Sequence, residues 1–183
     1  MCKSINKKSL ITKLHILIKE GFAIIVSKYK FGNKEGKKMS TYKNQTIIQA
    51  SAEDIFSVFL DSIKQDFSNF NEETAVGSAI KKAVSGYSMK TGQVEVEIKV
   101  FEKNKVYEIQ STSSHQVFTS RYELEALDIN KTKLTVTEIV VTQGMLGIFN
   151  DMLVKFVFKK GIKECFEHMV TSLNTQLNHK ISN

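Results

Sequence analysis

Residues 121–140 read RYELEALDINKTKLTVTEIV, and this stretch decides the fold because it describes two strands joined by a turn. From Tyr122 to Ala126, apolar or small residues alternate with charged ones, and a polar turn follows at Asp128–Lys131. The second half places four residues on one face: Leu134, Val136, Glu138 and Val140. Because side chains of a strand point alternately to its two faces, the pattern predicts a hairpin with one dry face.

Four earlier stretches also have strand patterning. Residues 94–100 alternate valine and isoleucine with glutamate and lysine, and residues 80–89 and 106–112 are further strand candidates. Residues 43–49 form a shorter candidate near the start. Because the connections between these stretches after residue 80 are short, the strands are predicted to pair in antiparallel hairpins.

Two segments instead have apolar residues at helical spacing. Ser51 resembles an N-cap with Asp54 three residues later, and the apolar positions between residues 55 and 70 predict two short helices. After a loop at residues 143–147, an apolar stripe predicts a long terminal helix. The stripe consists of Phe149, Met152 or Leu153, Phe156, Lys160, Phe166, Met169, Leu173 and Leu177.

This order of elements predicts an α+β fold in one domain over residues 39–183. A curved antiparallel sheet of about six to seven strands is expected to bury its dry face on the long C-terminal helix. Two short helices are expected after the first strand.

The chain resembles the START-like, or helix-grip, superfamily, which includes plant pathogenesis-related allergens and polyketide cyclases. Within it, the chain looks like a bacterial domain family of unknown function. The matching stretches are KNQTIIQASAEDIFSVFLDSI (43–63), SGYSMKTGQVEVEIKVFEKNKVYEIQSTS (85–113), RYELEALDINKTKLTVTEIV (121–140) and the long helix from GIFNDMLVKF (147–156) onward. The resemblance implies that the sheet and the C-terminal helix grip an apolar ligand between them.

The net charge of +7 is confined to the first part of the chain. Residues 1–38 contain ten lysines and two glutamates, whereas the rest carries sixteen basic and seventeen acidic groups. A nucleic-acid binder is expected to have a basic face on its folded body. The nearly neutral body therefore argues against a nucleic-acid partner.

The basic leader, residues 1–38, has three interpretations. An amphipathic helix over residues 8–30 would lie on a membrane surface, whereas a signal peptide would need an apolar core that Lys19 and Glu20 interrupt. The third, which we favour, is that residues 34–39 (KEGKKM) back-translate to a ribosome-binding sequence before a start codon. The natural protein is then expected to begin at Met39.

The two cysteines, Cys2 and Cys165, form neither a disulfide framework nor a zinc motif. Their isolation favours a reducing compartment, and we expect a cytoplasmic protein. No apolar run approaches the length of a membrane span. His168 shares a helical side with Glu164 and Cys165, but a surface pair beside a packed thiol is the expected arrangement, so no metal and no cofactor are predicted.

Glu138 is the most informative polar residue because its strand face is otherwise apolar. A buried carboxylate must find partners or take up a proton. Two arrangements stay open: Glu138 and tyrosine hydroxyls from neighbouring strands form the polar floor of a ligand cavity, or a bulge or a wet cavity end brings Glu138 to a lysine or to water. The full set of predicted lining residues is Tyr87, Tyr107, Ile109, Tyr122, Leu124, Glu138, Phe149, Met152 and Phe156.

Three functions remain open from the sequence. The favoured one is a small protein that binds a hydrophobic or lipid-like molecule between the sheet and the C-terminal helix. The second is a cyclase- or hydrolase-type enzyme that uses Glu138 and a tyrosine as acid and base. The third is a protein-interaction module with a filled core and an exposed apolar patch. No catalytic motif is recognisable, so an enzyme is the less favoured reading, and the oligomeric state is not specified.

Overall fold

A computed structural model describes residues 37–85, 91–113, 116–143 and 151–181 of the chain. Its strands form one antiparallel sheet in the order β1-β6-β5-β4-β3-β2. The strands are β1 (Lys37–Ile48), β2 (Ala79–Ser85), β3 (Thr91–Glu102), β4 (Val106–Thr112), β5 (Gln116–Asp128) and β6 (Lys131–Gln143). The predicted α+β class and the antiparallel sheet are confirmed.

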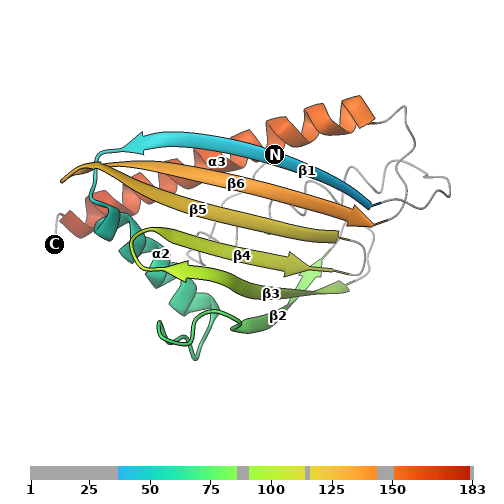
Figure 1. Ribbon diagram of the computed structural model, residues 1–183, viewed down its shortest axis with the longest axis horizontal. Coiled ribbons are helices and arrows are strands. Elements are labelled where there is room, and N and C mark those ends of the chain that lie inside the picture. The colour runs from blue at the N-terminus through green and yellow to red at the C-terminus, as the bar shows by residue number, and fades with distance from the viewer. Residues whose placement is uncertain (1–36, 86–90, 114–115, 144–150, 182–183) are drawn as a thin grey trace.

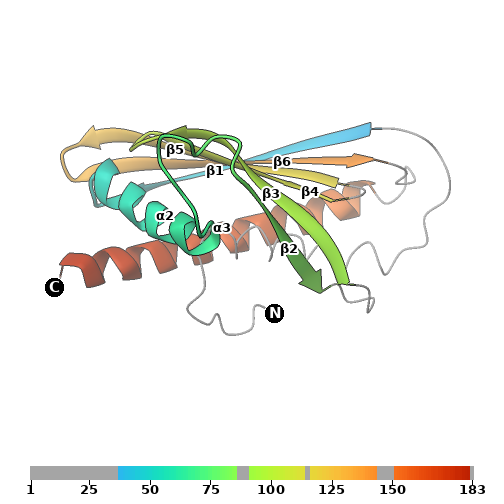
Figure 2. The same ribbon diagram turned by 90° about the horizontal axis from the view of Figure 1, so that it is seen from below.

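Two helices lie on the same face of this sheet, α2 (Ala52–Asp66) and α3 (Asp151–Ile181). Figure 1 shows the sheet over both helices, and Figure 2 shows β2 and β3 bending down toward them. The long α3 runs beneath the sheet on the side of β1 and β6. The curved sheet and the C-terminal helix thus form the predicted helix-grip arrangement.

The β5–β6 hairpin aligns the centre of the sheet. Its register is continuous from Gln116, opposite Thr142, to Ala126, opposite Thr132. The only shift falls at the turn, where the backbone N–H of Ile129 donates to Asp128 Oδ1 over 2.7 Å. Without a bulge inside the hairpin, the alternation in the sequence converts directly into inward and outward faces.

One predicted element is absent from the described residues, the second short helix after β1. The helix α2 begins as expected, since Ser51 Oγ accepts a hydrogen bond from the backbone N–H of Asp54 over 3.1 Å. It ends at Asp66, and residues 67–77 form turns in place of a helix. Asn71 shows why, because its Oδ1 accepts from the backbone N–H of Glu73 and so favours a turn.

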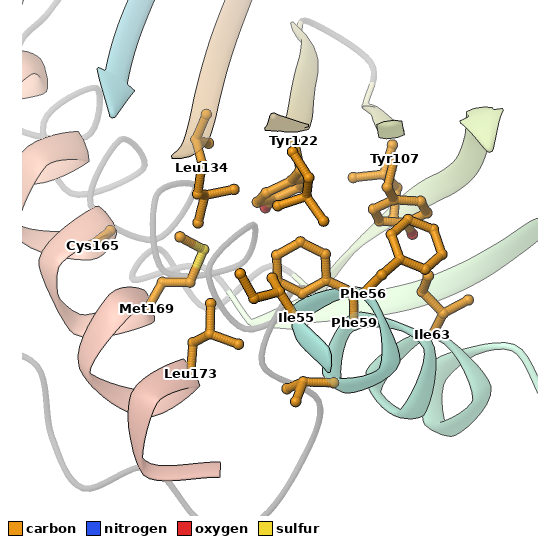
Figure 3. Close-up of a cluster of buried hydrophobic side chains, with 14 of the residues drawn as sticks. Ile55, Phe56, Phe59, Ile63, Tyr107, Tyr122, Leu134, Cys165, Met169 and Leu173 are labelled. Atoms are coloured by element: carbon orange, nitrogen blue, oxygen red, sulfur yellow. The ribbon is translucent and has the colours of Figure 1, made fainter. Parts of the chain in front are cut away.

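The core lies between the sheet and both helices. In Figure 3, side chains of α2 such as Ile55 and Phe59 and side chains of α3 such as Met169 and Leu173 point toward one another beneath Leu134. All five are less than 3% exposed. The helix α3 thereby contributes to the same core cluster as α2.

The predicted stripe of α3 needs one correction. Lys160 is exposed, and the inward positions of that part belong to Ile162 and Cys165, which are 3% and 7% exposed. Together with Met169 they follow spacings of three and four residues, as one helical face requires. Among the described residues, no helix is long and apolar enough to cross a membrane.

Candidate functional site

A row of inward side chains crosses the middle of the sheet. Tyr42 of β1 lies opposite Glu138 of β6, Glu138 lies opposite Ser120 of β5, and Ser120 lies opposite Ile109 of β4. Directly opposed residues on neighbouring strands share a face and have their Cβ atoms about 5 Å apart. Polar groups from three strands therefore meet on the face that the helices cover.

Glu138 is an ionisable group in the interior. Glu138 is only 1% exposed, and Ser120 Oγ donates a hydrogen bond to Glu138 Oε2 over 2.5 Å. Burial raises the pKa of Glu138 from 4.5 to about 8, an increase that the hydrogen bond from Ser120 partly offsets. At neutral pH this carboxyl group is therefore mostly uncharged and holds a proton.

Tyr122 places an unpaired hydroxyl group beside this carboxyl. The residue is 1% exposed, and its Oη has no hydrogen-bond partner among the described residues. Burial first, and then the nearby Glu138 and Tyr107, raise the pKa of Tyr122 well above its usual value, and the neighbouring Ser120 hydroxyl group offsets a small part of this increase. A buried hydroxyl without a partner is rare in proteins and destabilises the fold.

Aromatic rings hold Tyr122 in place. Its ring stacks on Tyr107 of β4 with centroids 6.0 Å apart, and the ring of Phe59 from α2 lies 5.5 Å away. Burial also raises the pKa of Tyr107, with a smaller contribution from Asp66. Figure 3 shows both tyrosines projecting from the sheet toward the helices. The hydroxyl group of Tyr122 therefore keeps its proton at neutral pH and can act as a hydrogen-bond donor.

The predicted lining residues whose side chains the structure describes lie together on the inner face of the sheet. Tyr107, Ile109, Tyr122 and Glu138 are each 1% exposed on the inner face, and Leu124 follows at 9%. Tyr87 and Phe149 lie outside the described residues. Met152 and Phe156 lie on α3, but their side chains fall outside the description. That these residues line a ligand cavity stays a prediction.

Two residues of the row were not singled out from the sequence, Ser120 and Tyr42. Alternation with Tyr122 already put Ser120 on the inner face, but only the register of β5 against β6 identifies it as the partner of Glu138. Tyr42 precedes the predicted first strand, and β1 is longer than predicted, beginning at Lys37.

The helical group around His168 has the expected surface character. Both Glu164 and His168 are exposed, and Glu164 faces Lys160 with 3.9 Å between Oε1 and Nζ. Cys165 is buried on the other side. Within the part of the chain that the structure describes, no three histidine, cysteine or carboxylate side chains are grouped as metal ligands would be.

Comparison with known proteins places the chain in a family. The profile described as "Domain of unknown function (DUF3284)" matches residues 39–159, more than half of the sequence. The chain is a DUF3284 protein. No curated protein matches it in sequence.

Solved structures show the fold of this DUF3284 protein to be START-like. A protein of unknown function from Staphylococcus aureus, SA2116, has a TM-score of 0.63 at 11% identity, with 80% of this chain and 98% of that chain covered. The Zhui aromatase/cyclase from Streptomyces sp. R1128 gives 0.56 at 9% identity, covering 79% and 96%. A START superfamily protein from Mycobacterium smegmatis gives 0.51 at 17% identity, covering 76% and 97%. At these identities the similarity establishes the fold alone.

Proposed function

We propose that this protein binds a small, largely apolar molecule against the inner face of the sheet, beside α3, with Tyr122 and Glu138 as its polar end. The observation that carries the proposal is the buried hydroxyl group of Tyr122, which has no partner among the described residues. Burying such a group costs about 1–3 kcal/mol. A guest with a hydroxyl or carbonyl oxygen would supply the missing hydrogen bond.

The protonation state of the site supports a neutral polar group on the guest. Because the pKa of Glu138 is raised to about 8, its carboxyl group can donate a proton in a hydrogen bond at neutral pH. Tyr122 is also a donor, so two donors point into an otherwise apolar interior. Ligand pockets typically combine such a surface with a few placed polar groups. Solved structures with this fold include one described as an aromatase/cyclase, which is consistent with an interior that accepts small molecules.

The test is a comparison of binding and stability in Tyr122→Phe. The variant should bind 1-dodecanol about tenfold more weakly, measured by displacement of an environment-sensitive dye, because one hydrogen bond is lost. The free energy of unfolding of the same variant should be higher by about 1 kcal/mol, since the unpaired hydroxyl group is gone. The variant should therefore unfold at a higher urea concentration. Thr137→Val, which removes a half-buried hydroxyl group from the outer face of β6, is the matched control.

The opposite pair of results would contradict the proposal. If Tyr122→Phe loses stability and binds dodecanol as tightly as the unmodified protein, the hydroxyl group serves the fold and not a guest. Native mass spectrometry of freshly purified protein provides an independent check, because a retained small molecule should appear as added mass that organic solvent removes.

A second candidate function is acid–base catalysis by the same pair. The raised pKa of Glu138 favours it, since a carboxylic acid with a pKa near 8 can donate or accept a proton at neutral pH. Incubation with the retained guest separates the two functions. A guest recovered unchanged supports binding alone, whereas a guest that is converted by the unmodified protein and not by Glu138→Gln establishes catalysis.

A further inference from the structure

A groove of about 520 Å³ lies between β1 and α3. It is lined by Met39, Ser40, Thr41, Tyr42, Lys43, Asn44, Lys159, Ile162 and Lys163. Its size falls in the range of small-molecule sites, about 300–1,000 Å³. Because β1 is an edge strand of the sheet (Figure 1), the groove lies along the edge of the sheet.

The described charged groups on the helix side of the groove have one sign. Lys159 and Lys163 of α3 contribute ammonium groups, and the described residues that line the groove include no aspartate or glutamate. Within the described residues, Lys159 forms no ion pair, and Lys163 faces Glu167 alone, with 3.8 Å between Nζ and Oε1 and both side chains more than 60% exposed. Such an exposed pair contributes little, so the positive charge of the groove is largely uncompensated.

One residue of the groove adjoins the site of the proposed function. Tyr42 lines the groove and is also the direct cross-strand neighbour of Glu138. Ile162, which is 3% exposed, adds an apolar wall from α3. Since adjacent strands are about 4.8 Å apart, the backbones of β1 and β5, which carry Tyr42 and Tyr122, are separated by about 10 Å across the sheet. An elongated molecule is long enough to span this separation.

We propose that this groove is an anion-binding subsite that takes the carboxylate or phosphate head of the guest, while the apolar body extends inward past Tyr42. The inference rests on the proposed function, since it specifies the class of that guest as an anionic amphiphile with a second polar group at its far end. The lysines attract the head as point charges, and their attraction weakens as salt is added.

Three probes with the same carbon chain separate the two ends of the guest. 12-Hydroxydodecanoate carries both the anionic head and the distal hydroxyl group, 1,12-dodecanediol lacks the charge, and dodecanoate lacks the hydroxyl group. At low salt the hydroxy acid should bind about tenfold more tightly than the diol, and this preference should fall in high salt. Dodecyl phosphate in place of dodecanoate shows whether a phosphate head is preferred.

The variant for the groove is Lys159→Gln combined with Lys163→Gln, both at exposed side chains of α3. It should bind the hydroxy acid and the diol equally, while its affinity for the diol stays unchanged. Lys81→Gln combined with Lys105→Gln removes the same charge from exposed positions outside the groove and should leave the preference intact.

Each result has a distinct meaning. Equal affinity of the unmodified protein for acid and diol, or an unchanged preference in the double variant, overturns the subsite but leaves the proposed function standing. If the lysine-dependent preference is present but Tyr122→Phe binds the hydroxy acid as tightly as the unmodified protein, the subsite is supported and the proposed function fails. If the lysines affect binding only to vesicles of anionic phospholipid and not to the soluble probes, the groove is a membrane contact and the subsite is overturned.

Discussion

At the scale of single residues, Glu138 is a group whose protonation the fold controls. The carboxyl group lies on a strand face shared with Leu134, Val136 and Val140, and it receives one hydrogen bond, from Ser120. One hydrogen bond does not replace the hydration that a carboxylate loses on burial, so the folded state favours the protonated form. Ionisation of Glu138 therefore opposes folding.

This control predicts a specific dependence of stability on pH. The pKa of Glu138 is about 8 in the folded protein and about 4.5 when the chain is unfolded, so the folded state binds more protons between these values. Where the unfolded state binds fewer protons, the free energy of unfolding decreases as pH rises. The contribution of Glu138 is thus constant below about pH 4.5, decreases up to about pH 8, and then stays at its lowest value.

Glu138→Gln removes this contribution and keeps a carbonyl oxygen for Ser120. Relative to the unmodified protein, the variant should gain stability steadily from pH 5 to pH 8, by a total on the order of a few kcal/mol. Urea unfolding at several pH values measures the difference. Glu125→Gln, at an exposed side chain paired with Lys133, should show no such trend. A difference between Glu138→Gln and the unmodified protein that does not vary with pH would show that Glu138 ionises freely in the folded state.

The inner-face position of Glu138 was predictable, but its partner was not. Alternation fixes the face of a residue once the strand contains no bulge, and β6 is regular around Glu138. The pairing with Ser120 depends on which residue of β5 lies opposite, and the hairpin turn sets that register. Likewise, no pattern in β1 indicates that Lys159 lies across the groove from it, because this proximity arises from packing of elements that are more than 100 residues apart.

At the scale of elements, helical spacing alone did not predict where the helix after β1 ends. The apolar residues Phe67 and Phe70 continue the spacing of α2, yet the chain turns there, and the side chain of Asn71 competes for a backbone hydrogen bond. The terminal helix was predictable because its apolar stripe is long. Its inward face was misjudged around Lys160, where only the packing of α3 against the sheet shows that Ile162 and Cys165 point inward.

The burial of Leu173 predicts that the inner face of α3 anchors this helix to the core. Leu173 is 0% exposed and points toward α2 and the sheet in Figure 3. Leu173→Ala should lower the free energy of unfolding by about 2–5 kcal/mol, because it removes buried methyl groups and leaves a cavity. Asn174→Ala, the next position and exposed to solvent, should change it by about 0.5 kcal/mol or less. Equal effects of the two substitutions in urea titrations would mean that α3 is not anchored through this face.

At the scale of the whole molecule, the sheet and the two helices divide the interior into two regions. Toward the β5–β6 turn, α2 and the C-terminal half of α3 fill the space with side chains such as Phe59, Leu134 and Leu173. The row that contains Tyr42, Glu138 and Ser120 lies farther along the strands, on the side where the groove opens between β1 and α3. The packed region stabilises the fold, and the polar row is the place where the proposed guest would add the hydrogen bond that Tyr122 lacks among the described residues.

This division predicts that the guest contributes to the stability of the molecule. A ligand that binds only the folded state raises the free energy of unfolding, by about 3 kcal/mol at a hundredfold excess over Kd. Protein purified under native conditions should therefore unfold at a higher temperature than the same protein after denaturation, passage over an apolar resin and refolding. Adding back the extracted compound should restore the difference in the unmodified protein and restore much less of it in Tyr122→Phe. Identical unfolding temperatures before and after extraction, together with an extract that contains no bound compound, would contradict a guest in this interior.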